Sequence, residues 1–161
     1  MIGKRRSLLT NLILLGILSA LFTGIAIGVQ STLSGRIGSL IGTFKTGVMM
    51  NIMGGTIGAL IFVTLLIVKG KGFWQLPVPA LVMLIIAGAL GIMIVMGVSF
   101  SLQKTGAAAG LATIFIGQIV ISMIIDAKGW GGLTPIPITW PRIVGLLVMA
   151  TGLLLLLPKK T

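Results

Sequence analysis

The stretch ALVMLIIAGALGIMIVMGVSFSL, residues 80–102, contains no charged side chain. About 20 apolar residues, rising 1.5 Å each in a helix, are enough to cross the roughly 30 Å hydrocarbon core of a bilayer. The stretch is continuously apolar, whereas a strand of a membrane barrel would alternate in polarity. It therefore predicts a membrane-spanning helix.

Four further runs of the sequence have the same apolar character. Of the 161 residues, 57% are hydrophobic and only 8% are charged. The first run exceeds the usual 7 to 15 residues of a signal-peptide core, so we expect it to be retained as a span. We predict an all-α integral membrane protein with a single transmembrane domain, residues 1–161, and five transmembrane helices at residues 8–29, 46–68, 80–102, 106–125 and 141–158.

The charged residues argue against several classes of protein. The formal net charge is +11, yet the basic residues are scattered over the ends of the runs rather than clustered with aromatic residues, so lipid phosphates are expected partners and nucleic acid is not. The chain has no cysteine, no histidine and one acidic residue. Metal sites therefore lack ligands, and no nucleophile and base can be paired. We expect no enzyme activity and no cofactor.

The basic residues also bear on orientation in the membrane. Lysine and arginine are enriched on the cytoplasmic side of membrane proteins. Five spans place seven such residues on the side of the N-terminus and five on the other, which favours a cytoplasmic N-terminus by a small margin. Insertion in both orientations remains an alternative to a unique topology. The larger group is Lys4, Arg5, Arg6, Lys69, Lys71, Lys128 and Arg142, and the smaller is Arg36, Lys45, Lys104, Lys159 and Lys160.

Small residues recur at intervals of four within the spans, a spacing that lets helix backbones approach closely. Five short helices barely enclose a solute cavity, so we expect at least a homodimer, in which the copies could be antiparallel. The candidate packing residues are Gly16, Ala20, Gly24 and Gly28 in the first span, Gly54 and Gly58 in the second, and Gly106 and Gly110 in the fourth.

Strongly polar residues are rare near the predicted hydrocarbon. Gln118, Ser122 and Asp126 are spaced by four and so share one side of the fourth span. For Gln118, a hydrogen bond between helices and contact with a solute are equally consistent with the sequence. Gln30 and Asn51 lie nearer the membrane interface, where a bond between helices is favoured over solute contact. We treat Gln30, Asn51, Gln118 and Ser122 as candidate substrate-binding residues.

Asp126 is the single acidic residue, at the predicted end of the fourth span. We expect it to pair with Lys128, Arg142 or a basic residue of a second subunit; the alternative is ion or proton coupling. The segment from Ala127 to Trp140 is rich in glycine and proline, which predicts an irregular loop against the lipid headgroups.

Three segments carry a family resemblance: GIAIGVQSTLSGRIGSLIG at residues 24–42, GALGIMIVMGVSFSLQKTGAAAGLATIFIGQIVISMIIDAKGWGG at 88–132, and ITWPRIVGLLVMATGLLLL at 138–156. They resemble the YdcZ-like family, half-length five-span members of the drug/metabolite transporter superfamily. The chain departs from the family pattern at Ser34, where an asparagine is usual, and at Asn51 and Ile52, where a Ser-Phe pair is usual.

The resemblance implies a half-size transporter bundle of α-helices, assembly of two subunits, and a small-molecule exporter of the inner membrane that works by alternating access. The first span contains no acidic residue, unlike the small multidrug exporters of the same superfamily, which weakens the argument for cationic substrates. Two alternatives remain open. The chain could be a membrane scaffold or accessory subunit that transports nothing, or a lipid flippase or channel-like protein.

Overall fold

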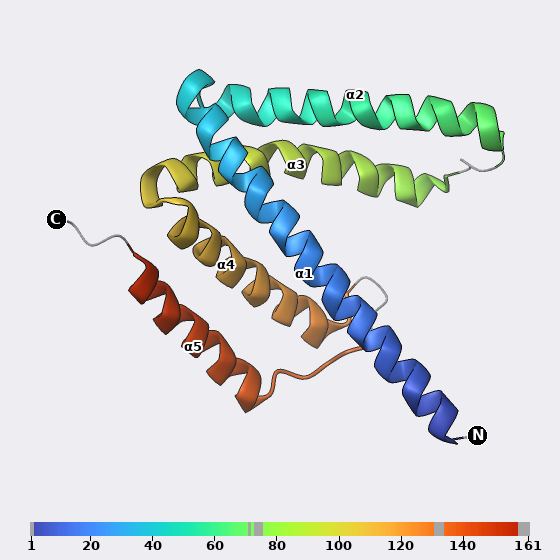
Figure 1. Cartoon of the computed structure of the whole chain (residues 1–161), viewed down its shortest axis with the longest axis vertical. Coiled ribbons are helices and arrows are strands. Elements are labelled where there is room, and N and C mark those ends of the chain that lie inside the picture. Colours follow the sequence, from blue (N-terminus) through green and yellow to red (C-terminus); the bar gives the residue numbers. More distant parts are fainter. Residues whose placement is uncertain (1, 71, 73–75, 131–133, 158–161) are drawn as a thin grey trace.

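The part of the chain that the structure describes contains five α-helices (Figure 1). The computed structural model describes residues 2–70, 72, 76–130 and 134–157, with side chains from Leu12 onward. Four helices are long and apolar enough to span a membrane, and a shorter apolar helix follows them. In order they are α1 (Ile2–Ile41), α2 (Thr43–Lys69), α3 (Val78–Thr105), α4 (Ala107–Lys128) and α5 (Trp140–Leu156).

The helix that contains the first predicted span is longer than the span itself. The sequence predicted an end at residue 29, whereas α1 continues to Ile41. No proline interrupts this stretch, and the helix ends only at Gly42, whose φ of 87° requires glycine. The polar residues Gln30 and Ser34 therefore lie on the same helix as the apolar run before them.

Two of the connections consist of one residue. Gly42 separates α1 from α2 and Gly106 separates α3 from α4, with backbone angles of φ 87°, ψ 151° and φ 80°, ψ 166°. This single residue must redirect the chain by itself, and an L-residue adopts such backbone angles only under strain. These two turns set the directions in which the helix pairs leave the centre of the molecule.

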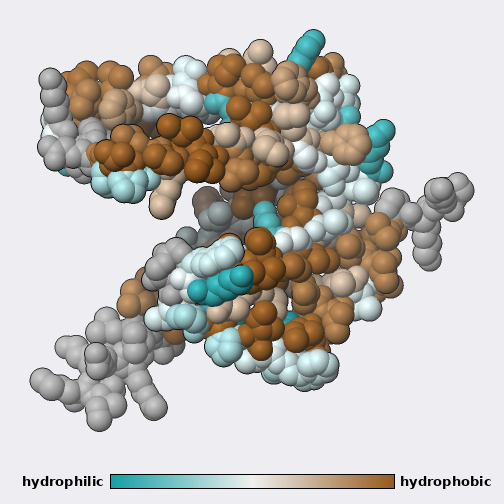
Figure 2. Space-filling view, turned by 180° about the vertical axis from the view of Figure 1, so that it is seen from behind, coloured by the Kyte–Doolittle hydropathy of each residue, from teal (hydrophilic) through white to brown (hydrophobic). Residues whose placement is uncertain are grey.

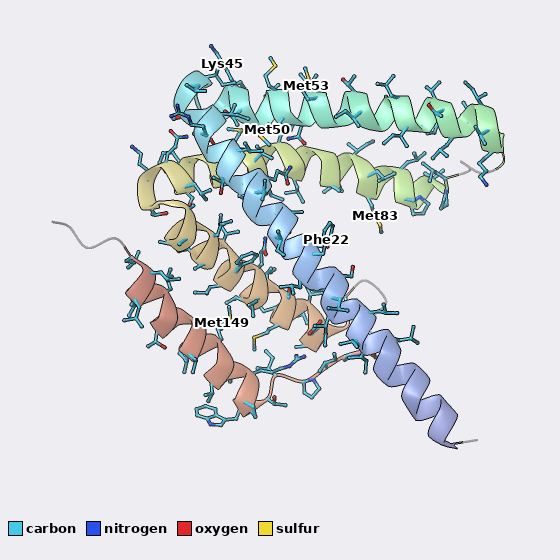
Figure 3. All side chains as sticks on the ribbon, in the orientation of Figure 1. Phe22, Lys45, Met50, Met53, Met83 and Met149 are labelled. Atoms are coloured by element: carbon cyan, nitrogen blue, oxygen red, sulfur yellow. The ribbon has the colours of Figure 1, made fainter. Side chains whose placement is uncertain are left out.

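The helices are arranged as two pairs crossed by α1. The α2 and α3 helices lie side by side, α4 and α5 form the second pair, and α1 crosses α3 and contacts α2 and α4 (Figure 1). Seen from behind, an open notch separates the two pairs, with hydrophobic side chains on both of its sides (Figure 2). Phe22 of α1 and Met83 of α3 are both exposed beside this notch (Figure 3).

The buried core lies where α1, α2, α3 and α4 meet, and it is small. Leu102 and Ala109 are its only buried hydrophobic side chains among the described residues. The rest consists of hydroxyl side chains and glycines, as is common where membrane helices approach closely. They are Ser31, Ser34, Thr46 and Ser99, with Gly35, Gly38, Gly47 and Gly110.

Candidate functional site

The contact between α1 and α3 is made by two serines. Ser99 is fully buried, and its hydroxyl donates to the backbone oxygen of Ser34 at 3.0 Å. The Ser34 hydroxyl donates to the backbone oxygen of Val95 at 3.3 Å. Gln103 donates to the Ser99 hydroxyl at 3.2 Å. Both helices thus exchange side-chain to backbone hydrogen bonds, which in a bilayer have no competition from water.

We expect Ser99→Ala to lower the free energy of unfolding by about 0.5 to 1.5 kcal/mol, because it removes the bond from α3 to α1. Unfolding by sodium dodecyl sulfate in mixed micelles, followed by circular dichroism, measures the change. Ser39→Ala is the control, since Ser39 is exposed and bonds only to Arg36 of its own helix. Equal stability of the two variants would contradict a role for the serine pair in holding α1 to α3.

Gln30 lies at the edge of a small cavity between α1, α2 and α3. The cavity has a volume of about 40 Å³ and is lined by Gln30, Ser31, Ser34, Met50, Val95 and Val98. Its size suits one or two water molecules rather than a solute. Gln30 itself is exposed and makes no hydrogen bond with the described residues. Its amide is thus available to a group outside the single chain.

Asn51 lies at the contact between α2 and α3. Its amide nitrogen donates to the backbone oxygen of Gly47 one turn earlier, at 2.8 Å. A side chain at Gly91 of α3 would place its Cβ 3.0 Å from the Asn51 Oδ1 atom. The glycine therefore makes room for the asparagine. Asn51 does not line the Gln30 cavity.

Gln118, Ser122 and Asp126, which are spaced by four along α4, differ in their surroundings. Gln118 is exposed and has no hydrogen-bond partner in the part of the chain that the structure describes. Ser122 and Asp126 line a groove between α4 and α5 with a volume of about 540 Å³. Gln30 and Asn51 do not line this groove, so the single chain does not bring all the predicted substrate-binding residues into one cavity.

Asp126 pairs with Arg142, one of the partners that the sequence predicted. The Arg142 Nη1 atom lies 3.4 Å from the Asp126 Oδ2 atom, and both side chains are about one third exposed, 34% and 31%. Asp126 also joins the connection to α4, because its backbone oxygen accepts hydrogen bonds from Gly129 and Ile136. This one residue therefore ties together the end of α4, the following loop and the start of α5.

The loop after α4 begins with a Schellman motif. Gly129 has φ 64° and donates to the oxygen of Asp126, while Trp130 donates to the oxygen of Ile125. Trp130 also lies under the Lys128 ammonium group, 5.0 Å from the ring centre to Nζ. The predicted irregular loop is confirmed over residues 134–139. Residues 131–133 lie outside the described part of the chain. The loop begins later than predicted, because α4 extends to Lys128.

The predicted packing residues also fall into two groups. A Cβ at Gly110 would meet Leu102 and Thr105 of α3, so Gly110 lies at a close helix contact. Gly106 forms the turn before α4. The remaining residues face open space in the single chain, and any close packing along them involves another molecule. These are Gly16, Gly24, Gly28, Gly54 and Gly58, where an added Cβ has no neighbour within 4 Å, and the exposed Ala20.

Sequence reasoning missed several residues of the buried core, notably Ser99, Thr46 and Gly38. Thr46 is fully buried and its hydroxyl returns to the oxygen of Gly42, four residues earlier. Two features of the sequence could have indicated this core. One is the serine within the third apolar run, and the other is the group of glycines that follow the predicted end of the first apolar run. Neither feature by itself distinguishes a helix contact from a surface facing lipid.

A comparison with protein families gives a match over most of the chain. The family model described as "Putative inner membrane exporter, YdcZ" matches residues 15–155, from the first half of α1 to the last turn of α5. No curated protein and no solved structure matches the chain.

Proposed function

The chain belongs to the YdcZ family of inner-membrane exporters, a transporter family and not an enzyme family. We propose that two copies of the chain together form a path for a small molecule. The path opens to each side of the membrane in turn. Its substrate-binding residues in this proposal are Gln30, Gln118 and Ser122, with Asn51 placed behind them at the α2 to α3 contact.

Gln118 carries this proposal. It lies near the middle of α4, is exposed, and finds no hydrogen-bond partner among the described residues. An amide group facing hydrocarbon is costly unless another helix, water or a solute satisfies it. A second copy that covers this face, leaving a polar space between the copies, would satisfy the amide and provide a site at mid-membrane.

The surface of the single chain supports assembly with a second copy. Gly16, Gly24 and Gly28 form an open stripe along α1, and a Cβ added at any of them would meet no atom within 4 Å. Such a stripe permits the close approach of a partner helix. The small margin of basic residues between the two sides fits antiparallel copies related by an axis in the membrane plane, an arrangement common in transporters.

If the transport cycle is coupled to an ion, the coupling residue in this proposal is Asp126, the only acidic residue of the chain. The Oδ2 atom of its carboxylate lies 3.4 Å from the Nη1 atom of Arg142, so a coupled ion would share the carboxylate with this guanidinium group. The first helix has no carboxylate, and we therefore expect no proton-driven efflux of a cationic dye such as ethidium from proteoliposomes.

A cysteine at position 118 tests the path directly, because the native chain contains none. In proteoliposomes, we expect Gln118→Cys to react with a charged, membrane-impermeant maleimide, since a transport path admits water to mid-membrane. The matched control is Ile85→Cys on α3, whose native side chain is 74% exposed in the single chain and which we expect to face lipid and stay unlabelled.

Two results would contradict the proposal. Labelling of Gln118→Cys as low as that of Ile85→Cys would mean that no water reaches this face. Single-molecule photobleaching of singly labelled protein in liposomes should show two steps for each particle, and one step would exclude a path made by two copies. A Gln118→Cys dimer that is labelled but has low stability and moves no solute would favour the alternative of a membrane scaffold.

A further inference from the structure

The seam between α4 and α5 contains two neighbouring cavities that differ in character. The first, about 540 Å³, is lined at one end by Ser122 and the Asp126 and Arg142 ion pair. The second, about 420 Å³, is lined only by apolar residues and glycine, among them Phe115 and Leu153. Met149, which lies between α4 and α5 (Figure 3), lines both cavities, so they meet at this residue.

The two cavities lie on the same flank of the helix pair. Phe115 and Ser122 are seven residues apart on α4, as are Gly145 and Gly152 on α5, and residues seven apart share a helix face. From Arg142 to Leu156 the helix rises roughly 21 Å at 1.5 Å per residue. The seam is therefore one groove with a charged end and a long apolar end.

The charged end lies where the lipid headgroups are expected. Trp130 and Trp140, both exposed, flank the loop between the helices, and tryptophan is enriched at the boundary between membrane and water. The apolar end of the groove then runs into the hydrocarbon. This is the orientation of an amphiphile in one leaflet, with its head at the ion pair and its tail along Met149 and Leu153.

The ion pair also limits the charge of the head. A purely anionic or cationic head would draw one partner of the pair away and leave the other charge without its partner at the edge of the hydrocarbon. A zwitterionic head can offer an anion to Arg142 and a cation to Asp126, which keeps every charge matched. Both side chains are about one third exposed and accessible from the groove.

We propose that the α4 to α5 groove binds an amphiphile with a zwitterionic head, taken from the surrounding leaflet, and presents it to the transport path. The inference rests on the proposed export function, because Gln118 lies one turn from Ser122 on α4. It assigns a substrate class to that function and a separate point of entry from the membrane.

Binding is measured with the protein in dodecyl maltoside, whose sugar head carries no charge. Met149→Cys carries an environment-sensitive fluorophore at the meeting point of the two cavities, and Met83→Cys carries the same fluorophore on α3 as the matched control. The quenchers are three amphiphiles with the same nitroxide-labelled tail: a lysophosphatidylcholine, a fatty acid and a quaternary ammonium. We expect the zwitterion to quench position 149 at about tenfold lower concentration than either charged quencher, with no such preference at position 83.

Variants of the ion pair and of the apolar end test the two halves of the groove. Asp126→Asn leaves Arg142 unpaired and should shift the preference to the fatty acid, whereas Arg142→Gln should shift it to the quaternary ammonium. Gly152→Leu fills the apolar end and should weaken quenching by the zwitterion about tenfold. Gly88→Leu on α3 is its control, since a Cβ at either glycine meets no atom within 4 Å.

Equal quenching by the three amphiphiles at position 149, or equal preference at positions 149 and 83, would overturn the inference. So would unchanged preferences in both charge variants. Labelled Gln118→Cys dimers without binding in the groove would refute the groove alone. Binding in the groove by a protein that forms no dimer would refute the proposed transport path and leave the groove as a lipid site.

Discussion

Gly47→Ala should lower the free energy of unfolding by about 1 to 3 kcal/mol, because an added methyl group has no space between α2 and α3. The Cβ would meet the Met96 side chain and lie 2.9 Å from the backbone oxygen of Ile92. The methionine can rotate away, but the backbone oxygen moves only with its helix. The change therefore pushes α3 away from α2 along their contact.

Gly54→Ala is the matched control for this prediction. Gly54 lies on the same helix, seven residues later, and a Cβ there meets no atom within 4 Å. Alanine is the better helix former by about 0.5 to 1 kcal/mol, so this variant should be as stable as the native chain or more stable. Unfolding in dodecyl sulfate mixed micelles compares the two, and similar losses in both would contradict the close contact at Gly47.

Gly106→Ala should cost about 1 to 3 kcal/mol for a different reason, the conformation of the backbone itself. At φ 80° and ψ 166°, Gly106 occupies a region that is almost restricted to glycine. The connection between α3 and α4 is this one residue, so no neighbouring loop residue can absorb the strain. The variant should also change the angle at which α4 leaves α3.

The control for the turn is Gly117→Ala, within α4. Gly117 has a helical conformation and open space around it, so alanine should be tolerated there or should stabilise the helix. Stability is read from dodecyl sulfate unfolding, and the separation of α3 and α4 from the distance between two spin labels placed on them. An unchanged distance and unchanged stability in Gly106→Ala would show that another residue sets the turn.

The five helices followed from the sequence because long apolar runs can be recognised without any tertiary information. The family and the membrane location also followed, from the segments around Gln30, Gln118 and Asp126, and the family match confirms them. The continuation of α1 to Ile41 did not, since the apolar run ends near Val29 and the residues after it are more polar. Ser34 and Gly38 are buried against α3 in this part of the helix, which only the packed structure reveals.

The candidate site was predictable in part. The spacing of Ser122 and Asp126 placed them on one side of α4, and Arg142 was among the expected partners of Asp126, as the structure confirms. The groove that they line was not predictable, because it depends on how α5 lies beside α4. The substrate-binding roles of Gln30, Asn51, Gln118 and Ser122 stay predictions, since they depend on a second copy or a solute outside the single chain.

The unequal lengths of the helices have a consequence for the bilayer that surrounds them. At 1.5 Å per residue, the 28 residues of α3 extend roughly 42 Å, whereas the 17 residues of α5 extend roughly 26 Å. A long helix adapts to a given hydrophobic thickness by tilting, but a short one must thin the lipid around it or be pulled inward. In thicker bilayers the hydrophobic mismatch is therefore largest at α5, and it strains the ion pair between α5 and α4. The acyl-chain length of the lipids should consequently affect this protein mainly through the position of its shortest helix, α5.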